Sequence, residues 1–116
     1  MKKFDDYQNK IIEFMNPRVL ESSDATLDNA ILGLCGESGE CADIIKKFRH
    51  HEKELNLEKL DLEVGDVIFY CALYALARKR NLSDIAQMNI DKLTKRYGGN
   101  EWSAEAANNK IDEIMR

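Results

Sequence analysis

The chain has 116 residues, of which 44% are apolar, and this is enough for the core of one domain. Its 17 basic and 21 acidic residues give a formal net charge of −4, which argues against a general nucleic-acid-binding protein, because such proteins are basic. No apolar run reaches the roughly 18–20 residues of a membrane span, and the first residues lack the apolar core of a signal peptide. We therefore expect a single domain, residues 1–116, that works in the cytoplasm.

The first half of the chain predicts two helices. Apolar residues spaced by three and four predict a helix from Phe4 to Met15, which Asn16-Pro17 should stop. The polar segment Ser22-Ser23-Asp24 offers cap residues for a second helix, from about Thr26 to His50.

The second half predicts three more helices. A charged link, His51 to Asn56, leads into a third helix from Leu57 to Arg80. Ser83 can cap a fourth helix that ends near Tyr97, before Gly98-Gly99-Asn100, and Ser103 can cap a last one to Met115. Without strand alternation or repeats, the pattern predicts an all-α fold, an antiparallel bundle of about four to five helices.

The third predicted helix carries two acids in an apolar sequence. From Val64 to Ala77 the only charged residue is Asp66, and burying an unpaired carboxylate costs several kcal/mol or more. Glu63 lies one turn earlier on the same face, so the two carboxylates repel each other. No Lys or Arg follows Asp66 within ten residues. Either another segment supplies a cation, or a metal ion does.

The second predicted helix carries a comparable pair. Its apolar stripe consists of Leu27, Ile31, Leu34, Cys41, Ile44, Ile45 and Phe48. Glu37 falls inside this stripe and Glu40 on its edge, whereas Asp43 points away and is expected to be solvated. Two helices joined by a short link are expected to be antiparallel neighbours, so that the pair faces Glu63 and Asp66. Four carboxylates in an apolar seam suit a hard divalent cation, Mg²⁺ or, as a substitute, Mn²⁺.

Three glycines, Gly33, Gly36 and Gly39, lie within this second helix. Each weakens a helix by roughly 0.5–1 kcal/mol, which suggests a need for space or for close packing. Among the nearby basic residues, Lys47 alone projects on nearly the same side as Glu40, and we include it among the candidate substrate-binding residues.

Other sites fit the sequence less well. His50 and His51 are adjacent, which is not the ligand spacing of a zinc site on one helical face. Neither histidine has an acid three residues before it, as a di-iron carboxylate bundle requires. Cys35, Cys41 and Cys71 form no Cys-x-x-Cys pair and are expected to be buried free thiols in a reducing compartment.

The class of protein that competes with a metal-dependent enzyme is a non-enzymatic helical interaction module, whose acidic pairs bind a basic partner or a structural cation.

Three segments follow one another along the chain, residues 33–47, 63–70 and 89–97. They read GLCGESGECADIIKK, EVGDVIFY and NIDKLTKRY. Together they resemble the MazG-like nucleoside triphosphate pyrophosphohydrolases, which belong to the all-α NTP pyrophosphatase superfamily. The resemblance covers roughly Leu27 to Tyr97. It departs from the family at Phe69, where many relatives have Trp, and at Gly98-Gly99, which replaces a Tyr-Pro continuation.

The resemblance implies a Mg²⁺-dependent enzyme that cleaves a (d)NTP to a (d)NMP and pyrophosphate. Its metal ligands and catalytic groups would be Glu37, Glu40, Glu63 and Asp66. The nucleotide or its phosphates would be contacted by Asn89, Lys92 and Arg96. A water activated by the metal would attack the α-phosphorus, and Glu37 or Glu40 would accept its proton.

The third helix also predicts an assembly. It is apolar nearly all round from Val64 to Ala77, and one small bundle does not easily cover every side of such a helix. We expect a homodimer or a homotetramer with this helix near an interface, and relatives of this kind are also oligomeric. The other expected partner is a nucleoside triphosphate, and neither a nucleic-acid polymer nor a membrane.

Overall fold

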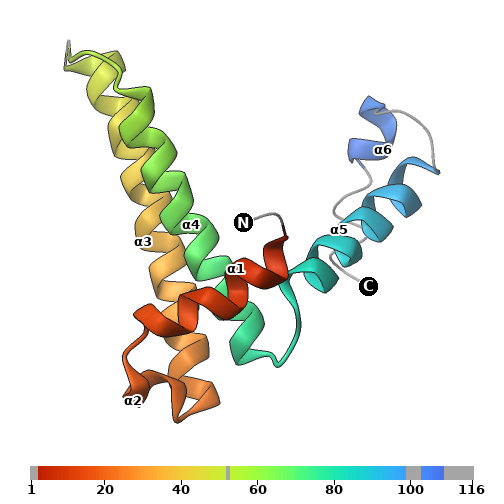
Figure 1. Ribbon diagram of the computed structural model, residues 1–116. Helices are drawn as coiled ribbons and strands as arrows, with labels where there is room; N and C mark the ends of the chain where they lie inside the picture. Colours follow the sequence, from red (N-terminus) through yellow and green to blue (C-terminus); the bar gives the residue numbers. More distant parts are fainter. Residues whose placement is uncertain (1–2, 52, 99–102, 109–116) are drawn as a thin grey trace. The chain divides into compact units, whose positions relative to one another are not determined.

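The computed structural model describes residues 3–51, 53–98 and 103–108. Every regular element in these ranges is helical, as Figure 1 shows, and the predicted all-α class is confirmed. The elements are α1 Phe4–Ile11, the 3₁₀-helix η1 Ile12–Phe14, α2 Pro17–Leu20, α3 Ser23–His50, α4 Leu57–Ala77, α5 Leu82–Tyr97 and α6 Ala104–Asn108. The chain forms two compact units, Met1–Leu82 and Ser83–Arg116.

The first unit is organised around a long antiparallel hairpin of α3 and α4, which lie side by side over most of their lengths (Figure 1). Both helices begin at a side-chain cap. The Ala25 amide donates to Ser22 Oγ at 3.2 Å, and the Lys59 amide donates to Asn56 Oδ1 at 3.0 Å. Each cap satisfies an amide that has no partner inside its helix, typically stabilising the start by about 1 kcal/mol.

The core of this unit lies near the start of α3 and the end of α4, where α1 packs against α4 and α2 packs against α3 (Figure 1). Four side chains at its centre are at most 2% exposed: Ile11, Ala30, Ala72 and Leu73. The aromatic rings of Tyr7, Phe69, Tyr70 and Tyr74 surround them. Burial of a Leu or Ile side chain contributes about 1.5–3 kcal/mol each, so this core fixes α1 across the hairpin.

Gln8 of α1 ties the segment after α4 to the core. Its side chain is 4% exposed. Its Nε2 donates to the Arg80 carbonyl at 2.7 Å, and its Oε1 accepts from the Leu82 amide at 2.6 Å. One buried side-chain amide thereby hydrogen-bonds to both a carbonyl and an amide of the segment that follows α4.

Several predicted boundaries are corrected. Asn16-Pro17 does not simply stop a helix, because Asn16 Oδ1 accepts from the Arg18 amide at 3.0 Å and Pro17 begins the short helix α2. The predicted cap Ser83 already lies inside α5. The predicted third helix ends at Ala77 rather than Arg80, and Lys79 follows with a φ of 55°.

The predicted last helix begins as expected after Ser103, but the part of it beyond Asn108 lies outside the described residues. The expectation of buried cysteines is wrong for Cys35, which is exposed, whereas Cys41 and Cys71 are half-buried free thiols. Cys35 lies two residues before Glu37, about 200° around α3 and therefore away from α4. Among the described residues, no helix has the length and apolar character needed to cross a membrane.

Candidate metal centre

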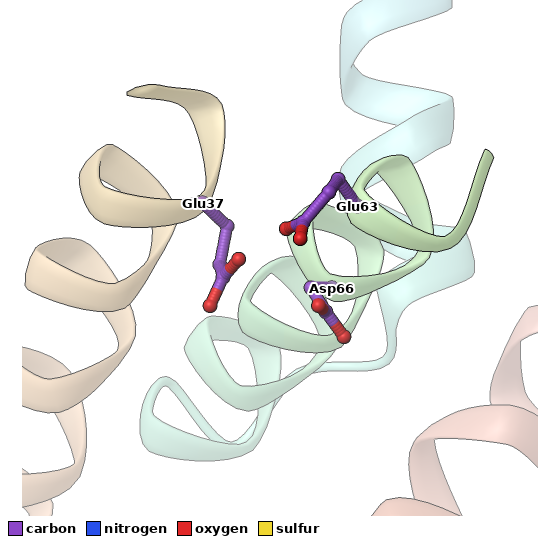
Figure 2. A group of neighbouring side chains, drawn as sticks. All are labelled: Glu37, Glu63 and Asp66. Carbon is purple, nitrogen blue, oxygen red and sulfur yellow. The ribbon is translucent and has the colours of Figure 1, made fainter. Parts of the chain in front are cut away.

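Three carboxylates from the two arms of the hairpin meet in one place. Glu37 reaches from α3 toward α4, which presents Glu63 and Asp66 on the same face, one turn apart (Figure 2). Each residue offers one oxygen atom, and the three oxygens lie within 4.8 Å of one another. The antiparallel arrangement expected from the short link therefore brings acids 26 residues or more apart in sequence together.

Glu37 and Glu63 are half-buried, whereas Asp66 is exposed, so the expectation of a buried carboxylate at this position is wrong. In the part of the chain that the structure describes, basic side chains do not neutralise the three carboxylates. Among the described residues, no lysine or arginine lies within ion-pair distance of Glu37, Glu63 or Asp66. Glu63 Oε2 is moreover buried without a hydrogen-bond partner. An unsatisfied buried oxygen costs about 1–3 kcal/mol, and more when it is charged, so the arrangement is unfavourable unless a cation or a proton occupies it.

The pKa of Glu37 reflects this crowding. It is raised above its ordinary value, first because a protonated Glu37 can donate a hydrogen bond to Glu63. Partial desolvation raises it further, followed by the negative charges of Asp66, Glu63 and Glu40. Glu37 thus takes up a proton more readily than an isolated glutamate.

The donor set fits a hard divalent cation. Carboxylate oxygens are the ligands that Mg²⁺ and Mn²⁺ prefer, and Glu63 Oε2 is buried without a hydrogen-bond partner among the described residues. Mg²⁺ prefers six oxygen ligands and usually keeps several waters, so three protein ligands would leave positions for water and phosphate oxygens.

Two predicted site residues of α3 lie outside this group. Glu40 is exposed, and its carboxylate contributes to the site by raising the pKa of Glu37. Lys47 Nζ lies 2.8 Å from Asp43 Oδ2, and this ion pair lowers the pKa of Asp43 and raises that of Lys47. Asp43 is partly exposed and forms this surface ion pair, which agrees with the expectation that it is solvated. The predicted roles of Glu40 as a ligand and of Lys47 as a phosphate contact stay predictions.

The predicted nucleotide contacts belong to the second unit. Asn89, Lys92 and Arg96 follow one another at spacings of three and four in α5, so they share one face of that helix. Asn89 and Lys92 are exposed, and the Arg96 guanidinium carbon lies 5.9 Å from the centroid of the Tyr97 ring. Their role toward a nucleotide stays a prediction.

The sequence did not point to Tyr7, which lies near the carboxylates. Burial raises its pKa, and the next largest cause is the negative charge of Asp66. The phenol of α1 is therefore close enough to Asp66 to sense its charge. The amphipathic pattern of the first predicted helix did not indicate where on the hairpin that helix would pack.

The glycines of the two arms differ in their surroundings. Gly36, Gly39 and Gly65 have open space where a Cβ would point, whereas a Cβ on Gly33 would overlap the ring of Tyr70. Both expectations from the glycine-rich segment are thus met, open backbone at two positions and close packing at the third.

The fold and the site together define the class of protein: an all-α protein with a candidate metal centre between the two arms of a helical hairpin. Residues 25–98 match the MazG nucleotide pyrophosphohydrolase domain, which is more than half of the chain. The chain therefore belongs to the MazG nucleotide pyrophosphohydrolase domain family. The match confirms the predicted family and runs across the boundary between the two compact units.

One curated relative is the Gene 37 protein of Mycobacterium phage L5, which is 35% identical over 74 residues. The alignment covers 60% of this chain and 65% of the phage protein, so the chain spans slightly less than two thirds of that relative. No solved structure gives a significant match.

Proposed function

We propose that this chain is a Mg²⁺-dependent nucleoside triphosphate pyrophosphohydrolase, which cleaves a (d)NTP to a (d)NMP and pyrophosphate. The observation that carries the proposal is the group of Glu37, Glu63 and Asp66, three carboxylates at one level of a hairpin that pair with no described lysine or arginine, in a MazG-family chain. Three carboxylates bind a divalent cation, and such a cation is what a triphosphate needs to be held and cleaved.

The acidic residues of the chain would have separate roles in binding the metal ion and in accepting a proton. Glu37, Glu63 and Asp66 hold the ion, and Glu40, one turn from Glu37, is the fourth predicted ligand. When bound, the metal offsets phosphate charge and lowers the pKa of a coordinated water. Glu37 or Glu40 accepts the proton of the attacking water.

The substrate would be held by cationic and amide groups. Lys47 lies on α3 within the electrostatic influence of Glu40, and Asn89, Lys92 and Arg96 offer one polar face of α5. Such groups bind phosphate oxygens and position the triphosphate. The substrate is a free nucleotide rather than a nucleic-acid polymer, and Mn²⁺ would substitute for Mg²⁺.

We also propose that the protein is a homodimer or homotetramer. Large apolar side chains are exposed on both arms of the hairpin, with Leu32 72% and Leu62 69% exposed, and Ile31 and Val64 more than 40%. A second copy that covered them would bury apolar area worth roughly 25 cal/mol per Å².

Three free thiols support the further proposal that the protein works in the reducing cytoplasm.

Product analysis tests the proposed reaction. The protein should convert at least one of the eight common NTPs and dNTPs to monophosphate and pyrophosphate in the presence of Mg²⁺, without a diphosphate intermediate. Release of orthophosphate and nucleoside diphosphate would instead identify a phosphatase. Metal binding without hydrolysis of any nucleotide would favour the interaction module with a structural cation.

A further inference from the structure

Directly next to the carboxylates, α3 and α4 meet at Gly33 and Tyr70. Gly33 lies four residues before Glu37 in α3, and Tyr70 lies four residues after Asp66 in α4. Because the two helices are antiparallel, both steps run in the same direction along the hairpin, by about 6 Å. The Gly33–Tyr70 contact is therefore the layer of packing that adjoins the metal centre.

The Tyr70 ring lies on the bare backbone of α3. A Cβ added at Gly33 would overlap three ring atoms, Cδ1, Cε1 and Cζ. The Phe69 ring meets the Tyr70 ring edge to face, with centroids 5.1 Å apart at an angle of 87°. The ring thus lies in a place that only a glycine in α3 leaves open.

This requirement is specific to one position. Gly36, Gly39 and Gly65 all lie within the same two helices, and a Cβ on any of them would meet no atom within 4 Å. A glycine inside a helix costs about 0.5–1 kcal/mol relative to alanine. At Gly33 the close approach of the Tyr70 ring accounts for this cost.

The spacing of α3 and α4 determines how the carboxylates meet. Glu63 and Asp66 belong to α4, so their spacing is fixed within one helix, whereas the position of Glu37 relative to them depends on how closely α3 approaches α4. Packed interiors absorb an added methyl only by moving side chains or backbone. Mg²⁺ requires ligand distances of about 2.0–2.1 Å in near-ideal octahedral geometry, so a displacement of even ~1 Å weakens its binding.

We infer that Gly33 is a positioning residue of the metal centre: by admitting the Tyr70 ring against α3, it sets the separation at which Glu37 meets Glu63 and Asp66. The inference rests on the proposed metal centre. It assigns no contact between Gly33 or Tyr70 and the ion. The effect is transmitted through the spacing of the two helices.

Mn²⁺ binding, followed by electron paramagnetic resonance or calorimetry without nucleotide, measures this effect. Gly33→Ala should weaken Mn²⁺ binding by about 10-fold or more, within the range of 10- to 100-fold seen when residues that support metal ligands are changed. Gly39→Ala is the matched control, since it adds the same methyl to the same helix in open space, and should leave the dissociation constant within about twofold of wild type. Circular dichroism checks that each variant is folded.

A second pair of variants, at Tyr70, tests the positioning role even if Gly33→Ala does not fold. Tyr70→Phe keeps the ring on Gly33 and should bind Mn²⁺ as wild type does, whereas Tyr70→Leu removes the ring and should bind about 10-fold more weakly. In the Tyr70→Leu background, Gly33→Ala should add less than about a twofold effect, because the ring it would strike is gone.

The outcomes separate the two proposals. If wild type binds no Mn²⁺, the proposed metal centre fails. If wild type binds Mn²⁺ and both Gly33→Ala and Tyr70→Leu bind it equally well, the centre stands and the positioning role is overturned. A loss of thermal stability in Gly33→Ala without a change in Mn²⁺ affinity would also overturn it, since Gly33 would then serve only the fold.

Discussion

At the scale of single residues, Asp66 distinguishes a metal site from a structural ion pair. It lies with Glu37 and Glu63 in a group of like charges and pairs with no described lysine or arginine. Asp66→Asn removes one charge at nearly constant shape, so the metal-free protein should melt at the same temperature or higher. A buried ion pair would behave in the opposite way, because loss of one partner costs about 3–5 kcal/mol. A strongly lowered melting temperature of metal-free Asp66→Asn would therefore contradict the account.

The pKa of Glu37 predicts a pH dependence of stability. Its pKa in the folded chain lies above the ordinary value of 4.5, so the folded state holds more protons than the unfolded state between the two values. The free energy of unfolding contributed by Glu37 is therefore greatest below pH 4.5, falls as the pH rises through this window and then stays constant.

Thermal melts of wild type and Glu37→Gln without metal isolate this contribution. The melting temperature of wild type relative to the variant should fall as the pH rises above about 4.5 and then reach a plateau. Mg²⁺ at ten times its dissociation constant should restore about 1.4 kcal/mol to wild type, and much less to the variant. A wild-type melting temperature that rises relative to the variant over this range would contradict the assigned direction.

The residues of the candidate site were only partly predictable. Glu37, Glu63 and Asp66 stood out because each is an acid inside an apolar helical pattern, and the structure brings these three together. Tyr7 could not be found in the same way, since its proximity to Asp66 depends on how α1 crosses the hairpin. Helical periodicity identifies the buried face of a helix but not the neighbour that this face meets.

At the scale of the elements, the strongest patterns predicted the long helices well. The second predicted helix ended at His50 as α3 does, and the Ser22 cap was among the polar residues indicated for its start. The short helix α2 was missed because Asn16-Pro17 reads equally as the end of one helix and the start of another. The cap at Ser83 was wrong, because α5 begins at Leu82 and Ser83 lies inside it.

This contact of Gln8 predicts a large effect on stability. Gln8→Leu keeps about the same side-chain size. It removes the acceptor for the Leu82 amide and the donor for the Arg80 carbonyl. A typical hydrogen bond contributes about 0.5–1.5 kcal/mol net, so the loss of both should lower the free energy of unfolding by about 1 kcal/mol or more. Urea denaturation measures it, with the exposed neighbour Asn9→Leu as a control expected within about 0.5 kcal/mol of wild type. Equal stability of Gln8→Leu and wild type would show that the contact is not stabilising.

At the scale of the whole molecule, the all-α class followed from the absence of any strand pattern, and the family from three ordered segments. Helical periodicity does not show where one compact unit ends, because the boundary falls inside a helix, directly after Leu82 of α5. The single domain expected for residues 1–116 stays a prediction for the same reason.

The exposed apolar side chains of the hairpin predict self-association. At micromolar concentration the protein should sediment with at least twice the chain mass of 13.3 kDa, because a monomer would leave Leu32 and Leu62 in water. A single species of about 13.3 kDa under these conditions would refute the proposed assembly.

The rate at which wild type and Asp66→Asn convert a dNTP to monophosphate and pyrophosphate with Mg²⁺ tests the central claim most directly. Wild type should release both products from at least one substrate of the panel. Asp66→Asn, folded and equally stable without metal, should do so at least about 100-fold more slowly, since the ion held by these carboxylates supplies several kcal/mol of transition-state stabilisation. Equal rates for the two proteins, or no monophosphate from any substrate with wild type, would contradict the assignment of Glu37, Glu63 and Asp66 as the metal centre of a nucleotide pyrophosphohydrolase.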